Sequence, residues 1–141
     1  MSRPASPDVE LRRRIFAFFA ANQRAPLAEE VGATAVDFSR LQERHALVVD
    51  DGGNIVIANP FSGIPTDYVV ESDGGRWFAN CCWDALGILA ALGVDGVVRS
   101  HCSDCGELLE LRIRHGELEP TSYVAHFLLP ARRWYDDLVF T

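Results

Sequence analysis

The sequence predicts an α+β fold, in which a small helical unit precedes a sheet that carries one helix. Three observations lead to this prediction. Apolar residues recur at helical spacing over the first third of the chain, and two β-branched runs follow around a glycine-rich turn. The second half alternates short strand-like runs with a single apolar helical run. With 141 residues, the chain has the length of about one domain.

The first predicted helix runs from Val9 to about Asn22. Its apolar residues lie largely on one side, and its three consecutive arginines lie largely on the other. Asp8 follows two prolines and is expected to cap this helix, because a carboxylate can accept hydrogen bonds from the free N–H groups of the first turn.

Two further helices and a hairpin follow. A short helix fits Leu27–Val31 and a longer one fits Val36–His45. Two β-branched runs then flank Asp50–Asn54, whose Asp-Asp-Gly-Gly-Asn sequence is a strong hairpin signal. Three helices followed by a hairpin describe a winged helix, so we expect a winged-helix-like domain over residues 1–59.

A winged helix raises two alternatives, a DNA-binding unit and a helical platform packed on the rest of the chain. The third predicted helix carries two arginines and two acids, so it presents no net positive charge to a DNA groove. The formal net charge of −7 also disfavours phosphate contacts. We therefore expect the platform and no nucleic-acid partner.

The second predicted domain covers residues 60–141 and begins in the turn-rich segment Asn59–Thr66. A helix is expected over Cys82–Leu92, which Gly93 ends. Five short runs are expected to be strands, at residues 68–70, 76–78, 94–99, 108–114 and 123–129. This part is predicted to be a small mixed or antiparallel sheet with a central helix. The three tryptophans are expected in the core: Trp77, Trp83 and Trp134.

Membrane and export signals are not found in the sequence. No stretch approaches the ~20 apolar residues of a membrane span, and the N-terminus has no apolar signal-peptide core. We expect a cytoplasmic protein without a membrane partner. Its four cysteines, at positions 81, 82, 102 and 105, are clustered, which in a cytosolic chain indicates metal or thiol chemistry rather than a disulfide scaffold.

The first cysteine pair and an aspartate lie where a predicted strand passes into the helix. A helix N-terminus offers free N–H groups and a partial positive charge, and both favour a thiolate at Cys81 or Cys82. One helical turn separates Cys81 from Asp84, so a sulfur ligand and a proton carrier would converge. The alternative is that Asp84 only caps the helix.

The second cysteine pair, Cys102 and Cys105, forms a C-x-x-C motif after a predicted strand. This spacing suits one corner of a metal site. A structural zinc site needs a second pair, and Cys81 and Cys82 are adjacent residues whose side chains diverge. His101 is a further candidate ligand. The alternative is that these cysteines are small hydrophobic residues and that His101 is a surface residue.

The run from Trp77 to Gly93, followed by Ser100-His101-Cys102, resembles the core of the alkylmercury (organomercurial) lyases. The segment Ala58–Ser62 and the winged-helix-like front fit that family too, so the resemblance covers most of the chain. Its most specific part is a Cys-x-x-Asp pattern followed about 18 residues later by Ser-His-Cys.

This resemblance implies an enzyme that cleaves a carbon–mercury bond. It makes Cys81 the first catalytic thiol, Asp84 the proton carrier and Cys102 a cysteine that mainly supports the fold. The family's second catalytic cysteine lies in the C-terminal part, where this chain has Trp134-Tyr135-Asp136-Asp137 and no cysteine. We therefore expect a divergent member, in which Cys82 or Cys105 is the second thiol or the reaction is impaired or replaced.

The implied chemistry needs no organic cofactor. Mercury is soft and prefers thiolates, and a nearby acid can protonate the departing carbon. The products are a hydrocarbon and Hg(II), which cellular thiols would carry away. One alternative is a non-catalytic soft-metal binder or metal-responsive regulator, with mercury, zinc or copper held by Cys81, Cys82, Cys102 and Cys105. Another is the same scaffold repurposed for a different small-molecule substrate.

Overall fold

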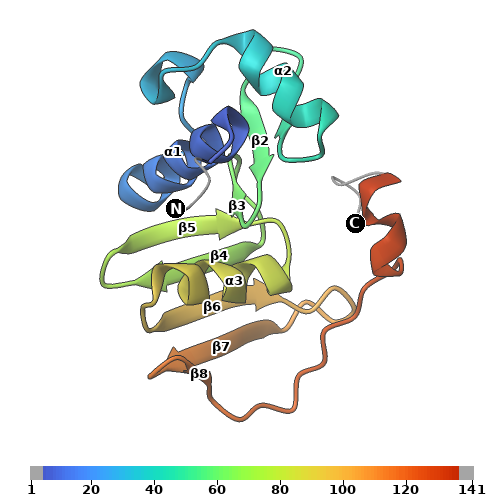
Figure 1. Cartoon of the computed structure of the whole chain (residues 1–141). Helices are drawn as coiled ribbons and strands as arrows, with labels where there is room; N and C mark the ends of the chain where they lie inside the picture. Colours follow the sequence, from blue (N-terminus) through green and yellow to red (C-terminus); the bar gives the residue numbers. More distant parts are fainter. Residues whose placement is uncertain (1–4, 137–141) are drawn as a thin grey trace.

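A single antiparallel sheet of eight strands forms the centre of the molecule, in the order β1-β2-β3-β5-β4-β6-β7-β8 (Figure 1). The computed structural model describes residues 5–136. The strands are β1 (Val48–Val49), β2 (Ile55–Ala58), β3 (Phe61–Ser62), β4 (Tyr68–Ser72), β5 (Gly75–Ala79), β6 (Gly96–His101), β7 (Leu108–Arg114) and β8 (Glu117–Leu118). The predicted α+β class is confirmed, and of the two sheet types predicted the antiparallel one is present.

The helices are α1 (Pro7–Asn22), α2 (Ala35–Glu43) and α3 (Cys82–Leu92), with the 3₁₀ turns η1 (Ala28–Val31) and η2 (Ala131–Asp136). The short second helix of the prediction is thus a 3₁₀ turn. The predicted cap of α1 is wrong: Ser6, not Asp8, accepts a hydrogen bond from the N–H of Val9, at 3.4 Å. No helix in the described part of the chain is long and apolar enough to cross a bilayer.

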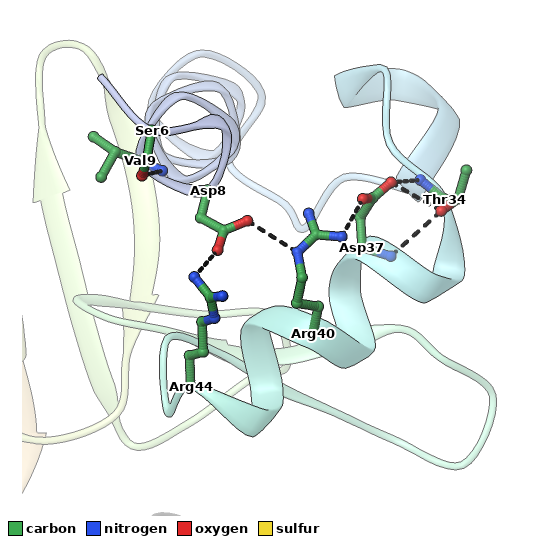
Figure 2. Close-up of polar contacts among 7 residues, drawn as sticks. All are labelled: Ser6, Asp8, Val9, Thr34, Asp37, Arg40 and Arg44. Carbon is green, nitrogen blue, oxygen red and sulfur yellow. Dashed lines mark hydrogen bonds and ion pairs between the residues drawn. The ribbon is translucent and has the colours of Figure 1, made fainter. Parts of the chain in front are cut away.

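Asp8 instead joins α1 to α2 (Figure 2). Its carboxylate binds Arg40 at 3.0 Å and also pairs with Arg44. Arg40 reaches Asp37 as well, at 2.8 Å, while the carboxylate of Asp37 accepts the N–H of Thr34 at 2.9 Å. The two arginines of the predicted third helix are therefore paired with acids of the same unit, which is the arrangement of a packed platform.

The helical unit is joined to the sheet by aromatic contacts. The ring centroids of Phe16 and Phe19 lie 5.2 and 5.0 Å from that of Phe61 on β3. The indole N–H of Trp77, on β5, donates to the carbonyl of Phe19 at 2.9 Å. Burying such a side chain contributes roughly 1.5–3 kcal/mol, so these contacts bind the first 60 residues firmly to the rest. Trp77 is in the core, as predicted, but Trp83 is 69% exposed.

The sheet continues through the predicted boundary near Pro60, because β2 pairs with β3 and β3 pairs with β5. The division into residues 1–59 and 60–141 stays a prediction. The strand predicted at 123–129 is wrong: residues 119–130 have no regular structure. The two-residue strand β8 ends at Leu118, and Pro120 has no N–H with which to extend a ladder there.

The helix α3 lies against the sheet and contacts β3, β4, β5 and β6 (Figure 1). Its buried residues are Ala85, Ile88 and Leu89, and Gly93 ends it in a left-handed conformation at φ 65°. The chain enters α3 from β5 and leaves it for β6. Because both of these strands pair with β4, the helix crosses over the strand between them.

Candidate functional site

The N-terminus of α3 carries the first pair of predicted site residues. Cys81 is the N-cap, with extended backbone, and its sulfur accepts a hydrogen bond from the N–H of Asp84 at 3.4 Å. The thiol of Cys81 and the carboxylate of Asp84 are also close enough to shift each other's pKa. Asp84 is therefore a partner of the thiol, and it is Cys81 that caps the helix. The predicted convergence of a thiol and a carboxyl group is present in the structure.

Both groups of this pair are half-buried. Burial raises the pKa of Cys81 to about 11, and the charge of Asp84 adds to the shift, although N–H donors of the first helical turn act against it. Burial likewise raises the pKa of Asp84. The expectation that the helix N-terminus favours a thiolate at Cys81 is therefore wrong for the free protein, in which the thiol keeps its proton at neutral pH.

Asn80 connects this pair to a distant turn. Its side-chain amide donates to the carboxylate of Asp84 at 3.3 Å, to the carbonyl of Phe61 at 3.2 Å and to the side chain of Asn59 at 3.0 Å. The sequence analysis did not identify Asn80. The only signal was indirect: the Ala58–Ser62 segment belongs to the resemblance, and Asn80 is the residue that binds it to the site.

Cys82 lies in different surroundings from its neighbour. It lines a cavity of about 270 Å³ that Cys81 does not line. Apolar side chains such as Leu86 and Leu111 form much of the wall, together with Tyr68, Cys102 and Tyr123. Burial raises the pKa of Cys82 as well. The cavity offers space for a small organic group next to a thiol.

The second cysteine pair lies on the turn between β6 and β7. The backbone N–H groups of Cys105 and Asp104 and the side chain of Cys105 lower the pKa of Cys102. Cys105 is exposed. His101 precedes this turn, and its ring is hydrogen-bonded to Asp67 at 2.7 Å. That bond holds the pKa of Asp67 below its usual value.

The predicted site residues thus fall in two places. Cys81 meets Asp84 at the start of α3, and Cys102 meets Cys105 on the turn, while Cys82 and Cys102 line the same cavity. Within residues 5–136, no three histidine, cysteine, aspartate or glutamate side chains are placed to hold one metal ion. The four cysteines therefore do not form a single metal centre. Of the C-terminal residues discussed above, Asp137 lies outside the described residues.

Comparisons with known proteins identify the family of this chain. The mercury-bound form of MerB2 has a similar structure, with a TM-score of 0.68 and 26% sequence identity. The match covers 85% of this chain and 62% of that one, so this chain spans less than two thirds of its relative's length. None of the curated proteins matches. The family model MerB, described as alkylmercury lyase, matches residues 61–141, which is more than half of the sequence. The chain belongs to the alkylmercury lyase family.

Proposed function

We propose that this protein cleaves organomercurials, with Cys81 as the thiol that captures mercury and Asp84 as the group that carries the proton. The observation that carries this proposal is the meeting of Cys81 and Asp84 at a half-buried helix N-terminus, where the N–H of Asp84 donates to the sulfur of Cys81 at 3.4 Å. The relative MerB2 was solved with mercury bound, which supports a mercury-directed function.

The first step is capture. With a pKa of about 11, the Cys81 thiol must lose its proton as its sulfur binds mercury. The neighbouring carboxylate of Asp84 accepts this proton. An S–Hg bond forms, the original anionic ligand of mercury leaves, and the proton moves to Asp84. Soft mercury prefers sulfur to the carboxylate oxygens, so Asp84 stays free for the proton.

The second step is cleavage. A second thiol binds mercury and releases its proton to solvent, which raises the electron density on mercury. The proton on Asp84 is then transferred to the carbon as the C–Hg bond breaks. The hydrocarbon leaves and Hg(II) stays bound to two sulfurs. The raised pKa of Asp84 suits this role, because burial favours its protonated form.

Of the two candidates for the second thiol, Cys82 is the one that lies near Asp84. The charge of Asp84 raises the pKa of both Cys81 and Cys82, so both sulfurs lie within its electrostatic reach. The cavity beside Cys82 accommodates the organic group of the substrate. Cys105 lies instead on the exposed turn after β6. Cellular thiols then remove Hg(II) from the site.

The test is to incubate reduced protein with phenylmercury and excess thiol and to measure benzene. We expect many turnovers from the wild type and none from Cys81→Ser. Serine is itself a good N-cap, so this variant should keep the melting temperature of the wild type. Unchanged benzene release in Cys81→Ser would refute the proposal. Stoichiometric binding without benzene would favour a soft-metal binder, and no binding would favour a repurposed scaffold.

A further inference from the structure

The turn between β6 and β7 is a second thiol site that the proposed lyase reaction does not use. Two backbone hydrogen bonds of 2.8 Å close this turn, one from the N–H of Cys102 to the carbonyl of Glu107 and one from the N–H of Gly106 to the carbonyl of Cys102. Gly106 has φ 73°, a left-handed conformation that glycine adopts without strain. The turn therefore holds residues 102 and 105 in a defined relation.

This turn brings its two thiols together. Cys102 and Cys105 lie at opposite ends of the turn that the bond from the N–H of Gly106 to the carbonyl of Cys102 closes. Neither cysteine is in a disulfide. A C-x-x-C spacing suits two sulfur ligands of one metal ion. The turn thus presents two sulfur ligands that are already arranged for one ion.

The surroundings of the pair select the kind of ion. In the part of the chain that the structure describes, no third histidine, cysteine or acid completes a site with these two sulfurs. His101, next to the turn, is hydrogen-bonded through Nδ1 to Asp67. Zinc in proteins almost always takes four ligands, whereas a soft ion can be satisfied by two thiolates.

We propose that Cys102 and Cys105 chelate a soft two-coordinate cation, and that Hg(II) is such a cation. Two S–Hg bonds form, the two original anionic ligands of mercury leave, two thiol protons are released to solvent, and no electron is transferred. Cys102 lines the same cavity as Cys82, so this site borders the cavity beside the proposed second thiol. That this pair accepts the Hg(II) product of the lyase reaction rests on the proposed function. That the pair binds Hg(II) does not rest on it.

The experiment uses the full chain with Cys81→Ser and Cys82→Ser, which leaves only the pair at 102 and 105. Mercuric chloride is titrated into the protein, and binding is followed by the ultraviolet sulfur-to-mercury absorbance and by proton release. A competing monothiol is then added, and the mercury that stays on the protein is counted by mass spectrometry to give the affinity. We expect one Hg(II) and two protons per chain. Adding Cys105→Ser should weaken binding on the order of 100-fold or more, because chelation is lost. Zinc chloride should not compete at equal concentration.

Three results would overturn the proposal: equal mercury affinity with and without Cys105, a complex of two chains per mercury ion in native mass spectrometry, or zinc binding as tight as mercury binding. Cys105 is exposed, so its replacement by serine should leave the melting temperature unchanged. The test contains no organomercurial and lacks Cys81. Its failure is therefore separate from failure of benzene release by the wild type.

Discussion

The two thiol regions of this molecule use the same kind of hydrogen bond and reach opposite results. At the start of α3, backbone N–H groups donate to the sulfur of Cys81, and its pKa is nevertheless raised to about 11. On the turn after β6, backbone N–H groups donate to the sulfur of Cys102, and its pKa is lowered. The difference is burial, which removes water from Cys81 and leaves the hydrogen bonds dominant at Cys102.

This comparison separates two ways of using a thiol. A buried thiol keeps its proton until a substrate arrives, and it needs a neighbour such as Asp84 to receive that proton. A solvent-accessible pair can release its protons directly to water. The first arrangement suits coupled bond cleavage, and the second suits reversible metal binding.

The largest effect is expected when a substitution removes the proton acceptor Asp84 from the region at the start of α3. Asp84→Asn keeps the size of the side chain and removes its basicity, so benzene release should fall by about 100- to 10,000-fold. Binding of phenylmercury, measured by mass spectrometry of the intact adduct, should persist because Cys81 remains. A rate within threefold of the wild type would show that solvent, and not Asp84, takes up the proton.

A second experiment compares the two regions directly through their reactivity. With iodoacetamide at pH 8, Cys102 should be alkylated at least about tenfold faster than Cys81, since a larger thiolate fraction outweighs the lower nucleophilicity of a more acidic thiol. Peptide mass mapping over time measures both rates in one sample. Equal rates would mean that burial does not control the chemistry of Cys81.

A third change affects only the region at the start of α3, because it removes the hydrogen bonds by which Asn80 holds this region to the turn at residues 59–61. Asn80→Ala removes one donor from the carbonyl of Phe61 and one from the carboxylate of Asp84, and it should destabilise the fold by roughly 1–3 kcal/mol in urea unfolding. The control is Asn22→Ala, which removes one exposed hydrogen bond to the carbonyl of Phe18 and should cost less than about 0.5 kcal/mol. Mercury binding by the 102–105 pair should not change. Equal losses in the two variants would exclude the supporting role.

The smallest effect is expected from a substitution outside both thiol regions, at Glu30. Hydrogen bonds from Arg24, and another from the N–H of Leu27, lower the pKa of Glu30 from 4.5 to about 2. A lowered pKa in the folded state stabilises the fold above pH 4.5, and this contribution is lost as the pH falls toward 2. Glu30→Gln should therefore lower the melting temperature slightly at pH 7 and not at pH 2. Benzene release should be unaffected, and a pH-independent difference would contradict this assignment.

Local patterns were sufficient to predict several elements. The helix Cys82–Leu92 and the strand Leu108–Arg114 match the prediction residue for residue, because an apolar run ended by Gly93 and a strict alternation are local signals. The meeting of Cys81 with Asp84 followed from helical spacing alone. These features depend on few contacts from elsewhere in the chain.

Features that depend on distant contacts were missed. The strand Phe61–Ser62 exists because Phe61 pairs with Ala79, and Asn80 is important because its partners are Asn59 and Phe61. No local pattern reveals such pairings. The direction of the pKa shift at Cys81 also depends on burial, which is set by the packing of the whole sheet. For this reason the position of Cys81 at a helix N-terminus predicted a lowered pKa, whereas its pKa is raised.

The crossover of α3 over β4 has a consequence for how the protein is made. Because β5 and β6 both pair with β4 beneath α3, we expect Cys81 to be shielded only once these pairs have formed. A ligand that binds the unfolded chain opposes folding. We therefore expect soft metal ions added during refolding to compete with folding, and free thiols to relieve this competition.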